Sequence, residues 1–161
     1  MSETKTKSAV DCDVDCLNSM LRGEIAAVDT YEQVLRKFEG AEEPEAENML
    51  AHIRDEHSAA VKVLRECVVT AGGIPSENAG VWGVFAGTFT AGAKLIGTQT
   101  ALAALKQGEH HGIEQYGKTL ENEELSDECS DAVSNELLPR CRRHVEKLDQ
   151  MIDKLENSPS A

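Results

Sequence analysis

RGEIAAVDTY, residues 22–31, and QGEHHGIEQY, residues 107–116, decide the fold, because they show one helical pattern occurring twice. In each stretch a glycine precedes a glutamate, and a tyrosine follows that glutamate seven residues later. The chain contains two tyrosines, and both occupy this place. Apolar residues surround each motif at intervals of three and four, which is typical of one face of an α-helix. We therefore expect two equivalent helices, 85 positions apart.

After each of these two helices comes a second apolar stripe, that is, a set of apolar residues at helical spacing along one face. One contains His57 and the other His144, 87 positions later, and Val61 and Leu148 take matching places. The chain thus consists of two helical hairpins of the same design, joined by a long crossover over residues 72–98. An all-α, four-helix bundle with one long crossover is the predicted fold, because two hairpins can bury each other's apolar faces.

The predicted boundaries follow from helix start and stop signals. Pro44 suits the first turn of a helix, Gly72 and Gly73 suit a helix end, and Ser126 is a good N-cap. Pro139 lies inside the last helical stripe, so a kink or break is expected there. The predicted organisation is an N-terminal tail over residues 1–10, one domain over residues 11–157 and a C-terminal tail over residues 158–161.

Composition excludes several classes of function. The net charge of −13 argues against binding to nucleic acid or to anionic membranes, which require clustered Lys and Arg. The uncharged stretch over residues 78–93 is too short for a membrane-spanning helix, which needs about 20 apolar residues. The polar start MSETKTKSAV resembles no signal peptide, and five scattered cysteines are an odd set. These features predict a cytoplasmic protein with free thiols.

Each of the four stripes contains one ionisable residue with apolar neighbours on both sides. Burying such a group costs several kcal/mol unless it is paired or bound to metal. We therefore expect the four to meet in the core, with the two tyrosines reaching carboxylates on neighbouring helices. The predicted cluster consists of Glu24, His57, Glu109 and His144, with Tyr31 and Tyr116 around it.

The order acid, histidine, acid, histidine along four helices resembles the ferritin-like carboxylate proteins. More closely, RGEIAAVDTYEQVL, RDEHSAAVKVL, the Trp-Gly crossover and LLPRCRRH look like a group of small bacterial ferritin-like domains with no assigned function. This resemblance covers roughly residues 12–155. It implies a ferritin-like bundle and, by analogy, a part in handling metal or oxidative stress.

Two positions depart from the di-iron pattern, in which a glutamate stands three residues before each histidine. Arg54 stands three residues before His57, and Cys141 stands three residues before His144. Because bridging carboxylates screen two metal ions from each other, their loss predicts at most one ion and feeble iron oxidation.

Three interpretations of the cluster remain open. The four residues hold one Fe, Zn or Mn ion, a choice suited to two nitrogen and two oxygen ligands. Alternatively, they form a metal-free network of imidazolium–carboxylate pairs and tyrosine hydrogen bonds. One form of this network has Arg54 in the vacant metal position, where it donates to Glu24 or Glu109. In the third interpretation, Cys141 joins the histidines in a redox-active or copper-binding thiol site. A binding protein or helical interaction module is favoured over an enzyme; an activity, if there is one, would be weak metal-dependent oxidation or reduction.

The remaining expectations concern residues outside the cluster. His110 and His111 are predicted to lie on the surface, and Asp55 and Glu56 are predicted to turn away from the face of His57. The large apolar residues of the crossover are predicted to form a homodimer interface, which would include Trp82, Phe85 and Phe89.

Overall fold

The structure is a computed structural model that describes residues 9–38, 43–80, 97–121 and 125–157. Helices account for most of these residues, and no strand occurs among them. The helices are α1 (Ala9–Phe38), α2 (Pro44–Thr70), α4 (Thr98–Leu120), α5 (Asp127–Ala132), the π-helical turn η2 (Val133–Leu137) and α6 (Leu138–Asn157).

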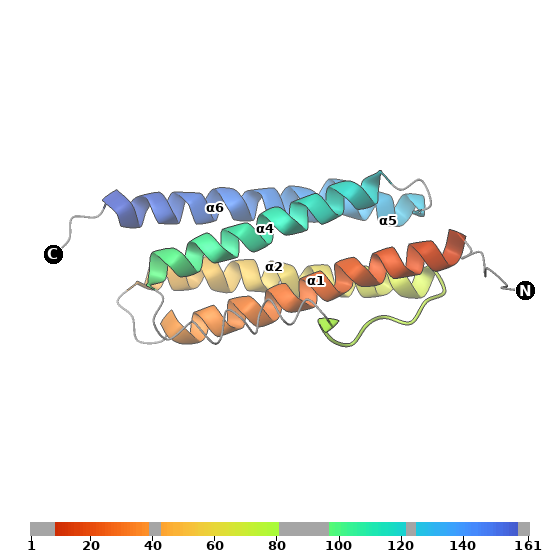
Figure 1. Ribbon diagram of the computed structural model, residues 1–161, viewed down its shortest axis with the longest axis horizontal. Helices are drawn as coiled ribbons and strands as arrows, with labels where there is room; N and C mark the ends of the chain where they lie inside the picture. Colours follow the sequence, from red (N-terminus) through yellow and green to blue (C-terminus); the bar gives the residue numbers. More distant parts are fainter. Residues whose placement is uncertain (1–8, 39–42, 81–96, 122–124, 158–161) are drawn as a thin grey trace, which may run out of the picture.

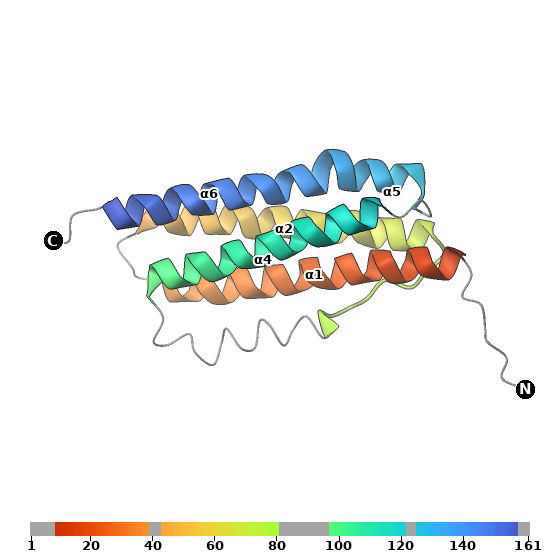
Figure 2. The same ribbon diagram turned by 45° about the horizontal axis from the view of Figure 1, so that its top comes forward.

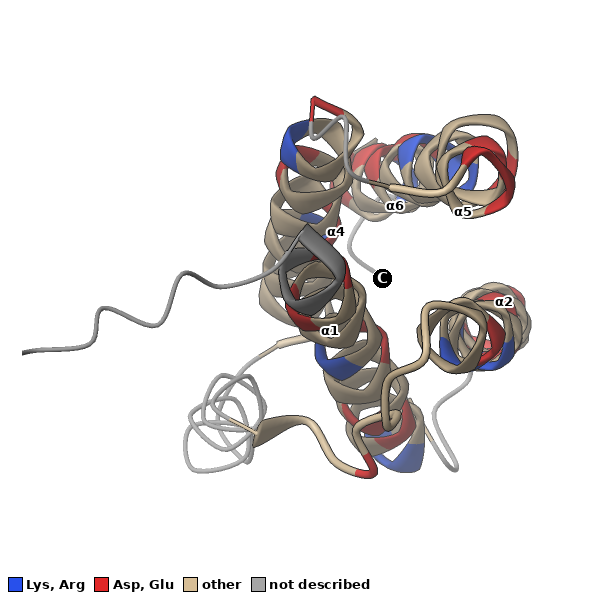
Figure 3. Ribbon diagram, turned by 90° about the vertical axis from the view of Figure 1, so that its right-hand side faces the viewer, with Lys and Arg blue, Asp and Glu red and all other residues tan. Residues whose placement is uncertain are grey.

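Four long helical segments make up the described part of the molecule, because α5, η2 and α6 follow one another without a break (Figure 1). α1 packs chiefly against α2, and α4 packs chiefly against α6. Viewed end-on, the four segments surround a common centre, and acidic residues occur along all of them (Figure 3). The predicted all-α fold of four helices is therefore confirmed.

The helix ends follow the expected local chemistry. Pro44 is the first residue of α2, where its missing N–H costs nothing. At the other end of α2, Gly72 adopts a φ of 78°, and the N–H of Gly73 donates to the carbonyl of Val68 at 2.9 Å. This is a Schellman ending, which favours glycine at the left-handed position. The hydroxyl of Ser126 accepts a hydrogen bond from the N–H of Cys129 at 3.3 Å, so its predicted role as an N-cap is confirmed.

The expected irregularity around Pro139 takes the form of a π-helical turn. The N–H of Leu138 donates to the carbonyl of Val133, five residues earlier, instead of four. Proline has no N–H and its ring crowds the preceding turn, so a wider turn just before it relieves both problems. The helix therefore continues through Pro139, and α6 presents His144 to the centre of the bundle.

The four helical segments run lengthwise side by side (Figure 2). The hydrophobic core between them is divided into two apolar clusters by a polar layer. One cluster includes Leu17, Leu21 and Leu64, and the other includes Val34, Leu50 and Leu148. Along each helix, the predicted cluster residue lies between members of these two groups. The polar layer is thus enclosed from both ends of the bundle, which strengthens its electrostatic interactions.

Several predictions concern residues that lie outside the described ranges. Trp82, Phe85 and Phe89 are among them, so the homodimer remains a prediction. Most of the predicted crossover, most of the predicted N-terminal tail and all of the predicted C-terminal tail also fall there. Within the described ranges, none of the helices has the length and apolar character needed to cross a membrane.

Candidate functional site: a buried glutamate–histidine cluster

The four residues predicted to meet in the core do meet there. Glu24 comes from α1, His57 from α2, Glu109 from α4 and His144 from α6. Their exposed fractions are 6%, 4%, 4% and 1%, respectively. Four helices therefore each contribute one ionisable side chain to a single buried layer.

His57 is held between two carboxylates. Its Nδ1 lies 2.6 Å from Oε2 of Glu24, and its Nε2 lies 2.8 Å from Oε1 of Glu109. Burial by itself lowers the pKa of His57, but the charges of Glu109 and Glu24 outweigh burial and raise that pKa to about 10. At neutral pH the ring is therefore an imidazolium that donates to both acids.

Glu109 is the junction of the cluster. Besides His57, its carboxylate accepts a hydrogen bond from the hydroxyl of Tyr31 at 2.6 Å and has Nδ1 of His144 at 3.2 Å. Burial tends to raise the pKa of Glu109, yet the positive charge of His57 and the histidine hydrogen bonds hold it well below its usual value. Glu109 is consequently ionised despite its burial, and its negative charge is spread over several donors.

The tyrosines pair with the acids crosswise. Tyr31 on α1 donates to Glu109 on α4, and Tyr116 on α4 donates to Glu24 on α1. Burial and the neighbouring carboxylates raise the pKa of both phenols well above the usual value. Both hydroxyls therefore keep their protons and act as fixed donors that tie α1 to α4.

Sequence reasoning missed one participant, Glu56. Its Oε2 lies 3.0 Å from Nε2 of His144, and the side chains of Arg140 and Lys147 lie nearby. Partial burial raises the pKa of Glu56, but the hydrogen bond to His144 and the surrounding positive charges produce a net lowering.

The prediction that Glu56 turns away from the cluster is therefore wrong, because a helix in a bundle contacts two neighbours. His57 points toward α1 and α4. Glu56, one residue earlier and about 100° around the helix, points toward α6. The feature of the sequence that could have indicated this contact is the acid, Glu56, directly before His57.

Arg54 does not take the place proposed for it in the metal-free network. Its guanidinium donates to Oδ1 of Asp55 through Nε at 3.0 Å and through Nη2 at 2.7 Å, on the outside of α2. The long side chain reaches water and an exposed acid there, which avoids the desolvation that entry into the core would cost. Asp55 also stays outside the cluster, as predicted.

Cys141 lies beside the acids as a neutral thiol. It is 3% exposed, and a Cβ built on Gly112 would lie 3.7 Å from its Sγ. Burial and the charges of Glu24 and Glu109 raise the thiol pKa far above its usual range. His110 and His111 are both exposed, as predicted.

A pocket of about 570 Å³ opens between α1 and α4 and reaches the cluster. Small residues form much of its wall, and Glu24, Glu109 and both tyrosines lie at its inner end. Gly108 borders it, and a Cβ added to Gly108 would meet no atom within 4 Å. The glycine before the second acid therefore leaves room for a ligand, because a backbone without a Cβ allows close approach.

Three of the cluster residues form a group that can hold a metal ion. Ligand atoms of His57, Glu109 and His144 lie within 4.8 Å of one another, and all three residues are buried. Two imidazoles and a carboxylate are donors that Zn, Fe and Mn accept. The fold and the cluster together thus define a helical bundle with a buried histidine–glutamate group whose ligand atoms lie close enough together to hold a metal ion.

The comparisons with known proteins place this bundle in a family. The chain belongs to the family described as domain of unknown function DUF2383, which matches residues 13–122. That range contains Glu24, His57 and Glu109 and ends before His144. No curated protein and no solved structure matches the chain.

Proposed function

We propose that this protein is a ferritin-like bundle, built from two related hairpins, that binds one divalent transition-metal ion at His57, Glu109 and His144. The observation that carries the proposal is the group of three buried ligand atoms, drawn from three helices, within 4.8 Å of one another. The crosswise tyrosine–glutamate pairs support the duplicated hairpin. A part in handling metal follows from the resemblance to ferritin-like proteins.

The surroundings of the two histidines support the choice of ligands. In metal sites, the imidazole nitrogen that faces away from the ion is commonly held by a carboxylate. Glu24 holds His57 at Nδ1, and Glu56 holds His144 at Nε2. The inner nitrogens, Nε2 of His57 and Nδ1 of His144, both face Glu109. In this arrangement Glu24 orients a ligand, in place of the direct role predicted for it.

One ion suits the cluster better than two. Cys141 and Arg54 occupy the positions where bridging glutamates would stand, and Arg54 is turned outward to Asp55. A single ion held by three protein ligands keeps positions for water or another small ligand, and in that state it acts as a Lewis acid. We propose a metal-binding role without assigning a reaction.

A metal-free structural network is the second candidate. The observation that favours it is the double hydrogen bond of His57, at 2.6 and 2.8 Å, which satisfies the ring completely. An ion at this place has to displace the proton on Nε2 of His57, so its binding must release protons and weaken at lower pH. The two candidates therefore differ in a measurable way.

Elemental analysis of protein purified without chelator or nickel resin tests the proposal, followed by Zn²⁺ titration with proton release recorded. We expect about one ion per chain in the wild type and severe loss in His57→Ala and His144→Ala. His110→Ala is the matched control, because His110 is exposed on the same helix as Glu109. Equal zinc binding by the wild type and both cluster variants would leave only the structural network.

A further inference from the structure

The pocket between α1 and α4 has the chemistry of a binding site for an organic cation. Its inner end contains the carboxylates of Glu24 and Glu109. Among the described residues that line it, none is lysine or arginine. The two carboxylates outnumber the one imidazole, that of His57, which lines the inner end with them. An anionic ligand would therefore be repelled by the carboxylates and would find no lysine or arginine among the described lining residues to pair with.

Glu24 is the carboxylate with room for another donor. An ionised carboxylate offers about four acceptor positions. From the described residues, Glu24 accepts bonds from Tyr116 and His57, which use one position on each oxygen. Glu109 is more crowded, because Tyr31, His57 and His144 all contact it. A further N–H donor in the pocket would thus pair with Glu24.

The walls of the pocket favour a ligand in which the N–H donor is attached to an apolar chain. Ala26, Ala27, Ala104 and Leu105 lie along them, and Thr30 and Gln107 add uncharged polar atoms. A volume of about 570 Å³ falls within the range of small-molecule sites. A ligand buried there gains affinity from its apolar surface and orientation from one polar end.

From these features we propose that the pocket between α1 and α4 binds a small organic cation, a primary ammonium group on an apolar chain, with the ammonium paired to Glu24. This site adjoins the proposed metal group and shares His57 and Glu109 with it, but the ammonium pairs with Glu24 and needs no bound metal. The ammonium end lies against Glu24 and the chain lies between the small residues of the two helices. Nearby rings of Tyr31 and His57 enclose the inner end.

The test measures binding of octylammonium, octanol and octanoate to metal-free protein by calorimetry, in the presence of chelator. Octylammonium should bind about tenfold more tightly than octanol, and octanoate should bind more weakly than both. Shortening octylammonium to hexylammonium should weaken binding about fourfold for each methylene group removed. Binding of octanoate equal to that of octylammonium, or no binding of octylammonium at all, overturns the proposal.

Two glycines of α4 provide a matched pair of variants. A Cβ on Gly108 or on Gly117 meets no atom within 4 Å, but of the two only Gly108 borders the pocket. Gly108→Phe should weaken the binding of octylammonium at least tenfold, while Gly117→Phe should leave the affinity for octylammonium unchanged. Equal affinities in the two variants would contradict the proposed place of binding.

Glu24→Gln tests the charge separately from the space. This variant should reduce octylammonium to the affinity of octanol, because it removes the ion pair and keeps the walls. Circular dichroism of each variant confirms that it is folded before titration. A Glu24→Gln protein that is folded and still prefers octylammonium tenfold would rule out Glu24 as the partner.

Discussion

Glu109 joins more elements of the bundle than any other cluster residue, so its replacement by glutamine is the sharpest test of the network. Glu109→Gln keeps the size of the side chain and removes its charge. It leaves the imidazolium of His57 with one carboxylate, Glu24, and it places an amide opposite Tyr31 and His144. We expect the variant to fold and to be markedly less stable than the wild type.

The magnitude follows from the position of His57. Its pKa rises from 6.5 to about 10 in the folded protein, chiefly through Glu109 and then Glu24, against the opposing effect of burial. A rise of that size corresponds to about 5 kcal/mol in favour of the folded imidazolium. This value is an upper limit for the stability that Glu109→Gln can remove through His57. Removing one partner of a buried pair typically costs about 3–5 kcal/mol. For a chain of this length the melting temperature should therefore fall by roughly 6–20 °C.

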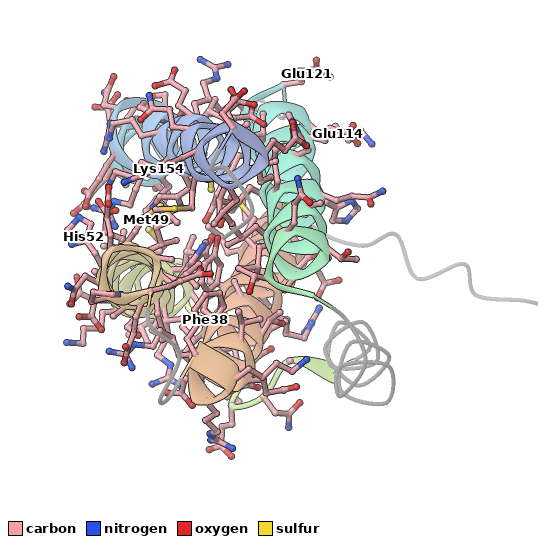
Figure 4. All side chains as sticks on the ribbon, turned by 90° about the vertical axis from the view of Figure 1, so that its left-hand side faces the viewer. Phe38, Met49, His52, Glu114, Glu121 and Lys154 are labelled. Carbon is pink, nitrogen blue, oxygen red and sulfur yellow. The ribbon has the colours of Figure 1, made fainter. Side chains whose placement is uncertain are left out.

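Thermal and urea unfolding at neutral pH, with chelator present, measure this loss. Glu114→Gln is the control, because Glu114 projects from the outer side of the same helix (Figure 4). It should change the free energy of unfolding by less than about 0.5 kcal/mol.

Replacing all four cluster residues by leucine should cost less than Glu109→Gln alone, since no charge is then left unpaired. A loss below about 1 kcal/mol for Glu109→Gln, or a greater loss for the fourfold variant, would refute a coupled network.

Three further outcomes are expected. Because the folded pKa of His57 is raised and that of Glu109 is lowered, metal-free protein should lose stability as pH rises from about 6.5 to about 10 and again as pH falls below 4.5; a flat urea-denaturation midpoint across both ranges would contradict the pairing. Ser126→Ala should cost about 1 kcal/mol in urea unfolding through loss of the N-cap bond, and unchanged stability would show that this cap contributes nothing. Wild-type protein should oxidise Fe²⁺ feebly, whereas Arg54→Glu combined with Cys141→Glu should take up two irons per chain with a change in absorbance on adding oxygen; rapid oxidation by the wild type would show that carboxylates at these positions are unnecessary.

The meeting of the four ionisable residues was predictable from sequence for a simple physical reason. Apolar neighbours at helical spacing fix the direction of each side chain, and the cost of burying a charge requires a partner. Glu24 and His57 meet both conditions, because each has apolar neighbours at helical spacing and each is the partner of the other. The helix ends at Pro44 and Ser126 were predictable because they depend on local backbone chemistry alone.

Other features depend on how the helices pack against one another and on how far a side chain reaches, and the apolar pattern of a single helix predicts neither. Glu56 was missed because assigning a single inner face to α2 ignores its second neighbour, α6. Arg54 was placed wrongly because its long side chain can leave the face on which its backbone lies. The pocket beside Gly108 depends on how α1 and α4 are spaced, and the small residues at that place are equally compatible with close helix contact.

The pocket and the proposed metal group share His57 and Glu109, so their ligands should oppose each other. An ion bound at His57 in place of its proton adds positive charge to the cluster and draws on the same carboxylates that make the pocket attractive to a cation. Coupling between two such sites is typically about 1–3 kcal/mol and must be reciprocal. Saturating Zn²⁺ should therefore weaken the binding of octylammonium at least fivefold, and saturating octylammonium should weaken the binding of Zn²⁺ by the same factor. Calorimetric titration of each ligand with and without the other measures both factors. Unequal factors would show that the two ligands do not act through one linked equilibrium, and factors of one would show that Glu24 and Glu109 do not couple the two sites.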